Sequence, residues 1–240
     1  MPIKCLRAVE ISIKLGRSVT KERVEFISRQ LILAWSVWLL ASWAVNMSID
    51  GPTTVTSDSM LPVVRWMLQS MALGMYVMWP AWRLSLANAY YGGREVIGDL
   101  IGLSLLIQLV VWPMRLLLDW SISQTLFLNL SLIIWAIPIG LWISWGLVWS
   151  TTMGWAGKMA AMLLCVATVI AGPLLAIGYG ELSLVAWNPI RVISDYTDPA
   201  NYWVDVSEWV QLGVVGMVAG IGWCSALIWP HSKAESGTSN

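Results

Sequence analysis

Charge is the property that this sequence has least of. Charged residues make up 12% of its 240 residues, whereas ordinary soluble domains carry about 25%. Hydrophobic residues reach 58%, and the mean hydropathy is +0.69. A water-soluble fold of this length has too little interior to hide so much apolar surface. The composition therefore excludes an ordinary soluble domain and predicts a chain that is surrounded largely by lipid.

Residues that serve in metal and acid–base chemistry are also scarce. The one histidine, His231, excludes a bis-histidine haem pair or a histidine-rich zinc site within the chain. Three cysteines, Cys5, Cys165 and Cys224, form no CxxC motif and are expected to be spectator thiols. The GxxxxGK[ST], HExxH and GxSxG motifs are missing. We therefore predict no catalytic residues, no cofactor and no metal.

Long apolar runs are what the sequence does have. They extend for about 20 residues without alternating polar and apolar positions, which favours membrane-spanning helices over barrel strands. The sequence predicts an all-α, polytopic transmembrane bundle with six spans, at 31–49, 61–81, 96–118, 126–149, 159–178 and 209–229. A basic N-terminal arm (1–30) precedes this six-span domain (31–230), and a disordered tail (231–240) follows it.

The basic residues predict the orientation of the chain. Seven of the 14 lysines and arginines lie in residues 1–30, and the 82–95 and 150–158 loops also carry cations. The 50–60 and 119–125 loops carry none, and the 179–208 loop has one cation against five carboxylates. Because positive loops stay inside, both termini are predicted to be cytoplasmic, in a cell inner membrane or plasma membrane. The first run is expected to be a retained anchor, with a cleaved signal as the alternative.

The stretch VWPMRLLLDW ends the third predicted span. Tryptophan prefers the headgroup layer, proline discourages further helix, and a cation favours a helix C-terminus. Arg115 is on the outer side, against the positive-inside rule. Asp119 follows four residues later, so the two are predicted to form an outer-face ion pair on one helical face. The alternative is a cationic site for an anion.

Four tryptophans of the fourth predicted span share one helical face. Trp135, Trp142, Trp145 and Trp149 recur at spacings of seven, three and four. This stripe is a candidate partner or ligand face, and three interpretations stay open. It packs against other helices or lipid, it docks onto a partner membrane protein, or it stacks on a flat ligand such as a quinone or pigment.

Two glutamines are predicted at similar depths in neighbouring spans. Gln69 lies about 12 Å from the start of the second span, and Gln108 about 18 Å from the start of the antiparallel third span, at about 1.5 Å per residue. An amide left alone in lipid would be costly. Gln69 and Gln108 are therefore a candidate interhelical polar pair, and the alternative is that both line a solvated pathway.

The remaining charges of the spans are predicted near the membrane edges. Arg65 can reach outward to Asp58 or Asp119, and Asp99 can reach Arg94 or Arg83. No ionisable group is expected at the midplane, where ion-coupled transporters usually carry one. This argues against a coupled transporter.

The outer amphipathic loop (179–208) contains two predicted helix starts. Asn188 can cap a helix with Pro189 at its first position, and Asp198 can do the same with Pro199. We expect the first helix to lie along the membrane surface. The loop is then either an interfacial lid or a binding surface for a ligand or partner.

The sequence favours a non-enzymatic membrane subunit that binds or organises membrane partners. The basic arm is expected to meet anionic lipid headgroups, with a cytoplasmic protein partner as the alternative, and no nucleic acid is expected. The second functional hypothesis is a permease for a neutral or lipophilic small molecule. An intramembrane enzyme is the weakest hypothesis, because no set of catalytic residues can be recognised.

Overall fold

The computed structural model of the chain describes residues 29–48, 56–86, 93–179, 188–198 and 203–235. Every regular element in these ranges is a helix, as predicted. The elements are the helix Arg29–Ser48, α2 (Ser57–Leu73), η1 (Gly74–Met78), α3 (Trp79–Leu86), α4 (Gly93–Leu118), α5 (Ile122–Met153), α6 (Trp155–Tyr179), α7 (Pro189–Tyr196) and α8 (Val206–Glu235). The N-terminal arm lies almost wholly outside the described residues, as does the end of the tail.

Four of these helices are long and apolar enough to cross a membrane. They are Arg29–Ser48, Gly93–Leu118, Ile122–Met153 and the segment Val206–Ser225 of α8. A shorter apolar helix covers Trp155–Ala171. Helices therefore coincide with all six predicted apolar runs, and the structure supports the helical membrane class, with four candidate spans.

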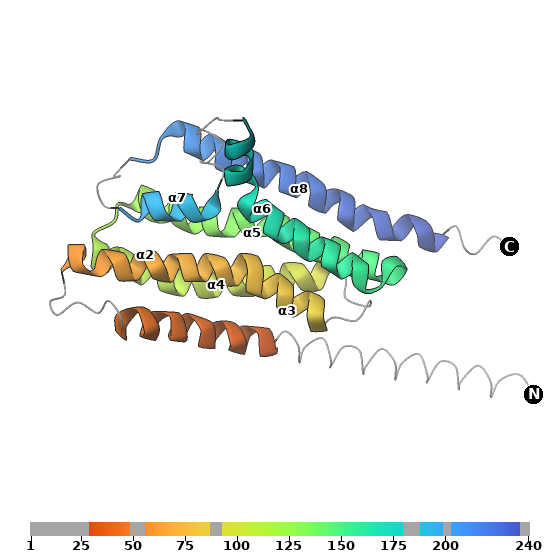
Figure 1. The fold of residues 1–240 in the computed structure, drawn as a ribbon, viewed down its shortest axis with the longest axis horizontal. Coiled ribbons are helices and arrows are strands. Elements are labelled where there is room, and N and C mark those ends of the chain that lie inside the picture. Colours follow the sequence, from red (N-terminus) through yellow and green to blue (C-terminus); the bar gives the residue numbers. More distant parts are fainter. Residues whose placement is uncertain (1–28, 49–55, 87–92, 180–187, 199–202, 236–240) are drawn as a thin grey trace, which may run out of the picture.

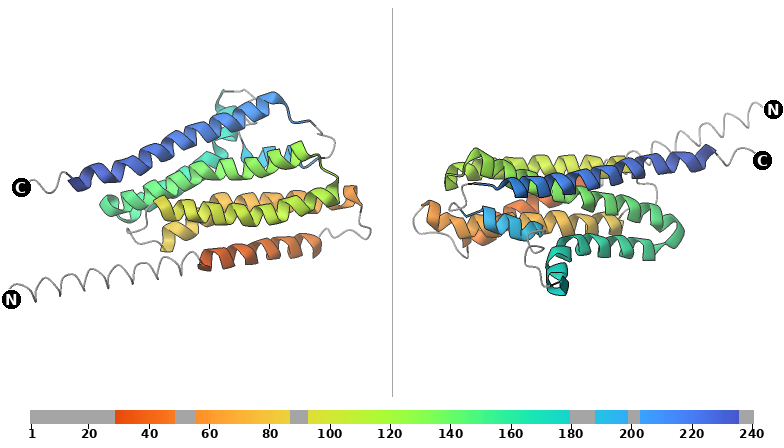
Figure 2. Two further views of the ribbon diagram at one scale, coloured as in Figure 1. Left: turned by 180° about the vertical axis from the view of Figure 1, so that it is seen from behind. Right: turned by 90° about the horizontal axis from the view of Figure 1, so that it is seen from above.

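The long helices lie side by side and run back and forth along one axis (Figure 1). The α5–α6 turn lies at the opposite end of the bundle from α7. Gly154 closes this turn with φ 59, a left-handed conformation that glycine adopts without a Cβ clash. Helix α5 is the central element, because α4, α6 and α8 all pack against it. Figure 2 shows α8 and the helix Arg29–Ser48 on opposite sides of the bundle.

Small residues bring α5 and α6 into close contact. A Cβ added to Gly146 of α5 would lie only 2.3 Å from the Cβ of Ala161, and one added to Gly157 of α6 would lie 2.7 Å from the carbonyl carbon of Trp149. Neither position has room for a larger side chain. This is the means by which helices associate in lipid, where burial of apolar surface provides no driving force.

The second predicted span is helical throughout but contains a π-helical turn. The turn, Gly74–Met78, joins α2 to α3. The first residue of this turn, Gly74, faces the helix Arg29–Ser48, and an added Cβ would lie 2.4 Å from the Trp35 ring. An indole of the same helix, that of Trp38, donates to the carbonyl of Ser70 at 3.1 Å. A π-turn carries one extra residue, which rotates the helix that follows it.

The first predicted helix start of the outer loop is confirmed. Asn188 Oδ1 accepts from the Ile190 N–H at 2.9 Å, and Pro189 is the first residue of α7. Helix α7 runs alongside α2 and α5 (Figure 1), and its orientation relative to a membrane surface stays a prediction. Ile193 is fully buried in this position. The second predicted start, at 198–199, reaches into residues outside the described ranges.

Candidate functional site

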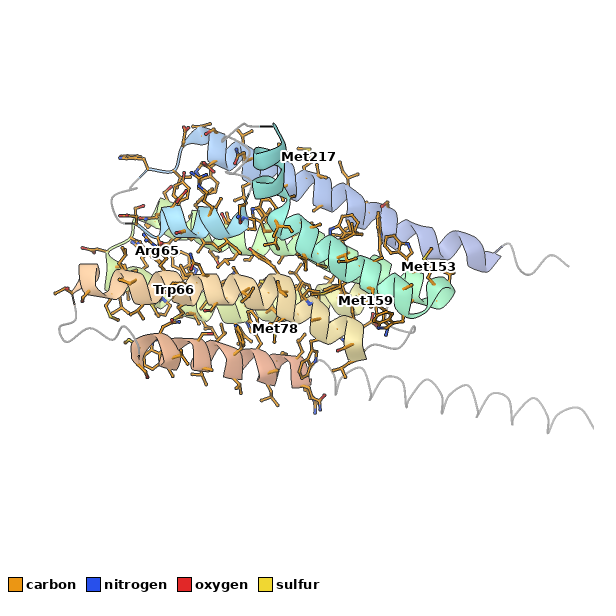
Figure 3. All side chains as sticks on the ribbon, viewed as in Figure 1. Arg65, Trp66, Met78, Met153, Met159 and Met217 are labelled. Carbon is orange, nitrogen blue, oxygen red and sulfur yellow. The ribbon has the colours of Figure 1, made fainter. Side chains whose placement is uncertain are left out.

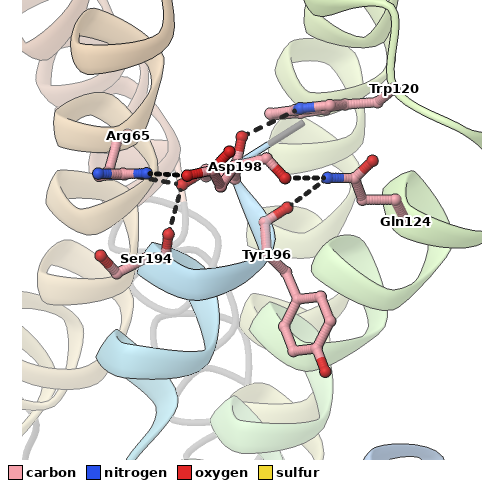
Figure 4. A network of polar contacts seen from close by, with 7 residues as sticks. Arg65, Trp120, Gln124, Ser194, Tyr196 and Asp198 are labelled. Carbon is pink, nitrogen blue, oxygen red and sulfur yellow. Dashed lines mark hydrogen bonds and ion pairs between the residues drawn. The ribbon is translucent and has the colours of Figure 1, made fainter. Parts of the chain in front are cut away.

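Polar side chains gather where the C-terminus of α7 meets α2 and α5 (Figure 4). Arg65 of α2 donates from Nε to Thr197 Oγ1 at 3.0 Å, and its Nη2 lies 3.7 Å from Asp198 Oδ2. The Thr197 hydroxyl in turn donates to the carbonyl of Ser194 at 2.8 Å. From the sequence, Asp58 or Asp119 was predicted as the partner of Arg65. The contact with Asp198 arises instead because α7 packs against α2.

Gln124 of α5 and Trp120, which directly precedes α5, complete this site with donors for the carbonyls at and just after the end of α7. Gln124 is fully buried, and its Nε2 donates to the carbonyls of Tyr196 and Asp198 at 2.7 and 3.2 Å. The indole of Trp120 donates to the carbonyl of Thr197 at 3.3 Å. Carbonyls at a helix C-terminus lack intrahelical donors. The polar network therefore caps α7 and fixes it to the bundle.

An aromatic cluster joins α7 to α8 next to this network. The Phe127 ring lies edge-on to Tyr196 and Trp209, with centroids 4.7 and 5.1 Å away. Burial, followed by the negative charges of nearby carboxylates, raises the pKa of Tyr196 to about 12. Hydrogen bonds from the Ser207 hydroxyl and the Val206 N–H hold the pKa of Asp205 below its usual range.

A crevice opens beside the aromatic cluster, between α5, α7 and α8. It encloses about 10 Å³, which is the room that one water needs. Its polar lining comes from Ser131, Glu208 and Gln211, and its apolar lining includes Phe127 and Trp135. The crevice is too small for an organic ligand as it stands.

A second polar centre lies at the other end of the bundle. Arg83 of α3 donates from Nε to Asp99 Oδ2 and from Nη2 to Oδ1, the latter at 2.5 Å. The Trp79 indole lies 3.5 Å from the same Oδ2. The side chains of the pair are 1% and 2% exposed. The sequence predicted Arg94 or Arg83 as the partner of Asp99, and in the structure Asp99 binds Arg83.

The geometry expected for Arg115 and Asp119 is absent. Helix α4 ends at Leu118, and Asp119 has φ 58, so it is not on the helical face of Arg115. Arg115 Nε donates instead to the carbonyl of Trp120 at 3.1 Å. Among the described residues no ion pair joins Arg115 to Asp119. The left-handed conformation of Asp119 ends the helical geometry on which the predicted pairing depended.

The two glutamines are not joined by a hydrogen bond in the described part of the chain, and both are half-buried. Gln108 lines an open groove of about 550 Å³ on the outside of α4, together with Leu105, Leu109, Trp112 and Pro113. The sequence predicted that Gln69 and Gln108 face each other between two helices. The structure instead places Gln108 at a groove on the outside of α4.

The tryptophan stripe lies partly in the contact between α5 and α6. The Trp142 indole donates to Thr168 Oγ1 of α6 at 3.0 Å. The Trp145 ring lies 5.3 Å from that of Trp142 and 5.9 Å from that of Trp149. Trp135, seven residues away from Trp142, lines the crevice between α5, α7 and α8. All four rings are half-buried, so they also present an outer edge.

Within the described ranges, no group of three or more histidine, cysteine or acidic side chains could hold a metal ion. Comparison with protein-family profiles, with curated proteins and with solved structures found no match. The class of the protein therefore rests on the fold: an all-helical chain with four helices that are long and apolar enough to cross a membrane.

Proposed function

We propose that this chain is a multi-pass protein of a cell inner membrane or plasma membrane, with six spans and both termini in the cytoplasm. It acts as a non-enzymatic subunit that binds or organises membrane partners. The alternation of cations along the sequence supports the orientation. The back-and-forth course of the helices agrees with it, because α7 and the α5–α6 turn lie at opposite ends of the bundle (Figure 1).

One contrast carries the functional proposal. Arg83 and Asp99 have the most buried charged side chains of the described bundle, and they form an ion pair with each other. The amide of Gln108, in contrast, lies at an open groove on the outside of α4. A protein whose polar chemistry faces outward within an apolar surface is suited to contact another membrane protein.

The exterior of the bundle is apolar over several helices. Figure 3 labels five exposed apolar side chains on this exterior, and each comes from a different helical element: Trp66, Met78, Met153, Met159 and Met217. Lipid can cover such a surface, and so can the helices of a partner. We further propose that the basic N-terminal arm binds anionic headgroups, because seven cations precede the first apolar run.

The permease alternative requires a solvated cavity among the spanning helices. Neither the crevice beside α7 nor the groove on α4 supports it, because the first encloses about 10 Å³ and the second lies on the outside of a helix. A flux assay on reconstituted vesicles addresses this alternative directly. Rapid equilibration of small neutral solutes by the purified chain would favour the permease.

The proposed function is tested by the mass of the native particle. Membranes expressing the tagged full chain are solubilised with a disc-forming polymer that carries the surrounding lipid along, and the particles are weighed by native mass spectrometry. We expect particles that contain the chain together with at least one further polypeptide, whether identical or different. Particles that contain a single copy alone would contradict the proposal.

A further inference from the structure

The outward face of α4 has a heptad-like pattern that no element of the described chain covers. Ile101, Leu105, Gln108 and Trp112 recur at spacings of four, three and four, which places them on one helical stripe. Ile101 and Leu105 are each 56% exposed, Trp112 is 38% exposed, and Gln108 is half-buried. We call these four residues the α4 seam. Such a stripe has the spacing that lets two parallel helices pack together.

Polar groups in this seam are unsuited to lipid. The side-chain amide of Gln108 forms no hydrogen bond within the described structure, although an amide in hydrocarbon is costly without one. Pro113 has no N–H, so the carbonyl of Leu109 lacks its usual helical donor four residues later. Both groups lie at the groove of about 550 Å³. Lipid tails cannot donate to or accept from either group.

The lining of the groove determines which partner fits. Its residues, Leu105, Gln108, Leu109, Trp112 and Pro113, carry no charge, so a partner helix with an ionised residue at this depth would find no counter-charge. An amide both donates and accepts, so its simplest complement is another amide at the same depth. Two copies of one chain insert with the same orientation, which places each residue level with its counterpart.

We propose that the α4 seam binds the α4 seam of a second copy, in a parallel pair around a two-fold axis, with Gln108 hydrogen-bonded to Gln108 of the other copy. This inference rests on the proposed function and names its first partner. A symmetric contact uses the same patch twice, and a single polar residue in an apolar seam fixes the register of the two helices. The indole of Trp112 and the carbonyl of Leu109 add a further donor and acceptor.

Cross-linking in native membranes tests the proposal while Gln108 stays intact. In a chain with Cys5, Cys165 and Cys224 replaced by Ala, Ile101→Cys introduces one thiol into the α4 seam. A membrane-permeant oxidant should then give a disulfide-linked dimer. Met217→Cys is the matched control, because Met217 is 67% exposed but lies on α8. It should remain monomeric under the same conditions.

The role of the amide is tested in the same background. Adding Gln108→Leu should reduce the association of Ile101→Cys chains by about 3- to 30-fold, the equivalent of about 0.6 to 2 kcal/mol for one interhelical hydrogen bond in a membrane. Gln69→Leu is the matched amide control and should leave cross-linking unchanged. Equal cross-linking with Gln108 and with Leu at this position would overturn the proposal.

Failure of the seam and failure of the proposed function give different results. If Ile101→Cys forms no dimer but the native particles contain another polypeptide, the seam proposal is wrong and the proposed function stands. If Ile101→Cys forms no dimer and the particles hold one copy alone, both are wrong. A dimer that depends on Gln108 supports both.

Discussion

Arg83 and Asp99 show how single residues fix helix α3 against α4. Each charge is almost fully buried, so each has lost most of its contact with solvent and is compensated by the opposite charge of the other. A bidentate guanidinium–carboxylate contact is the strongest arrangement available to such a pair, and the Trp79 indole is directed at the same carboxylate. The desolvation that makes the pair costly to bury also makes it costly to break.

Arg83→Met is expected to destabilise the bundle by about 3–5 kcal/mol, because it leaves the carboxylate of Asp99 buried without its bidentate partner. Thermal unfolding in a mild detergent, followed by circular dichroism, measures the loss of stability.

Arg94→Met is the matched control, since Arg94 belongs to α4 but is exposed, and this variant should change the stability little. The double variant Arg83→Met/Asp99→Leu should recover much of the lost stability. A double variant that is no better than the single one would contradict this account.

Helix α7 shows how an element depends on contacts that lie far away in the sequence. Its start is local, because Asn188 caps it and Pro189 fits its first position. Its orientation is not local, because Gln124 of α5 and Trp120, which directly precedes α5, donate to the carbonyls at and just after its end. Arg65 of α2 donates to the hydroxyl of Thr197 in the same place. An amphipathic eight-residue helix can lie on a membrane or pack into a groove with the same pattern, and here the buried donors select the groove.

Arg65→Met is expected to loosen α7, because it removes the contacts with Thr197 and Asp198. The side chain of Arg65 is 33% exposed, so solvent reduces the loss to about 1 kcal/mol, or about five-fold in amide protection of α7. Hydrogen exchange by mass spectrometry in lipid nanodiscs measures this loss of amide protection.

Arg191→Met is the matched control, because Arg191 pairs with Asp195 at the surface, with side chains 47% and 52% exposed. Such pairs contribute only about 0.3–0.5 kcal/mol. Equal loosening by both variants would show that the network does not hold α7.

At the scale of the whole molecule, α5 organises the bundle. It is 32 residues long, and it touches α4, α6, α7 and α8. The helix Arg29–Ser48 and α8 lie at the two sides (Figure 2), and each has only 17% of its apolar window buried. The periphery of the bundle is therefore where lipid or partner helices meet the chain.

Reporter fusions test the proposed orientation. An activity reporter fused after Asn240 should be active in the cytoplasm, and one inserted within 190–200 should be active outside, because cation-rich segments alternate along the chain. A fusion within 82–95 is the matched control and should agree with the C-terminal fusion. The same compartment for 190–200 and for the C-terminus would refute the six-span orientation.

The sequence by itself determined the class of the fold, the places of the helices and several local features. Long apolar runs require helices in a medium that cannot bond the backbone, and the Asn188–Pro189 start follows from capping chemistry. The partner of Asp99 was within reach of prediction, because the short connection between α3 and α4 brings Arg83 near.

Tertiary structure alone decided which face of each helix points inward. In a soluble helix the polar residues reveal the outer face, but here the lipid side and the core side are both apolar, so the sequence pattern loses that information. This is why the sequence paired Gln108 with Gln69, whereas the structure places Gln108 in an outer groove. For the same reason the packing of α7 between α2 and α5 could be read only from the folded chain.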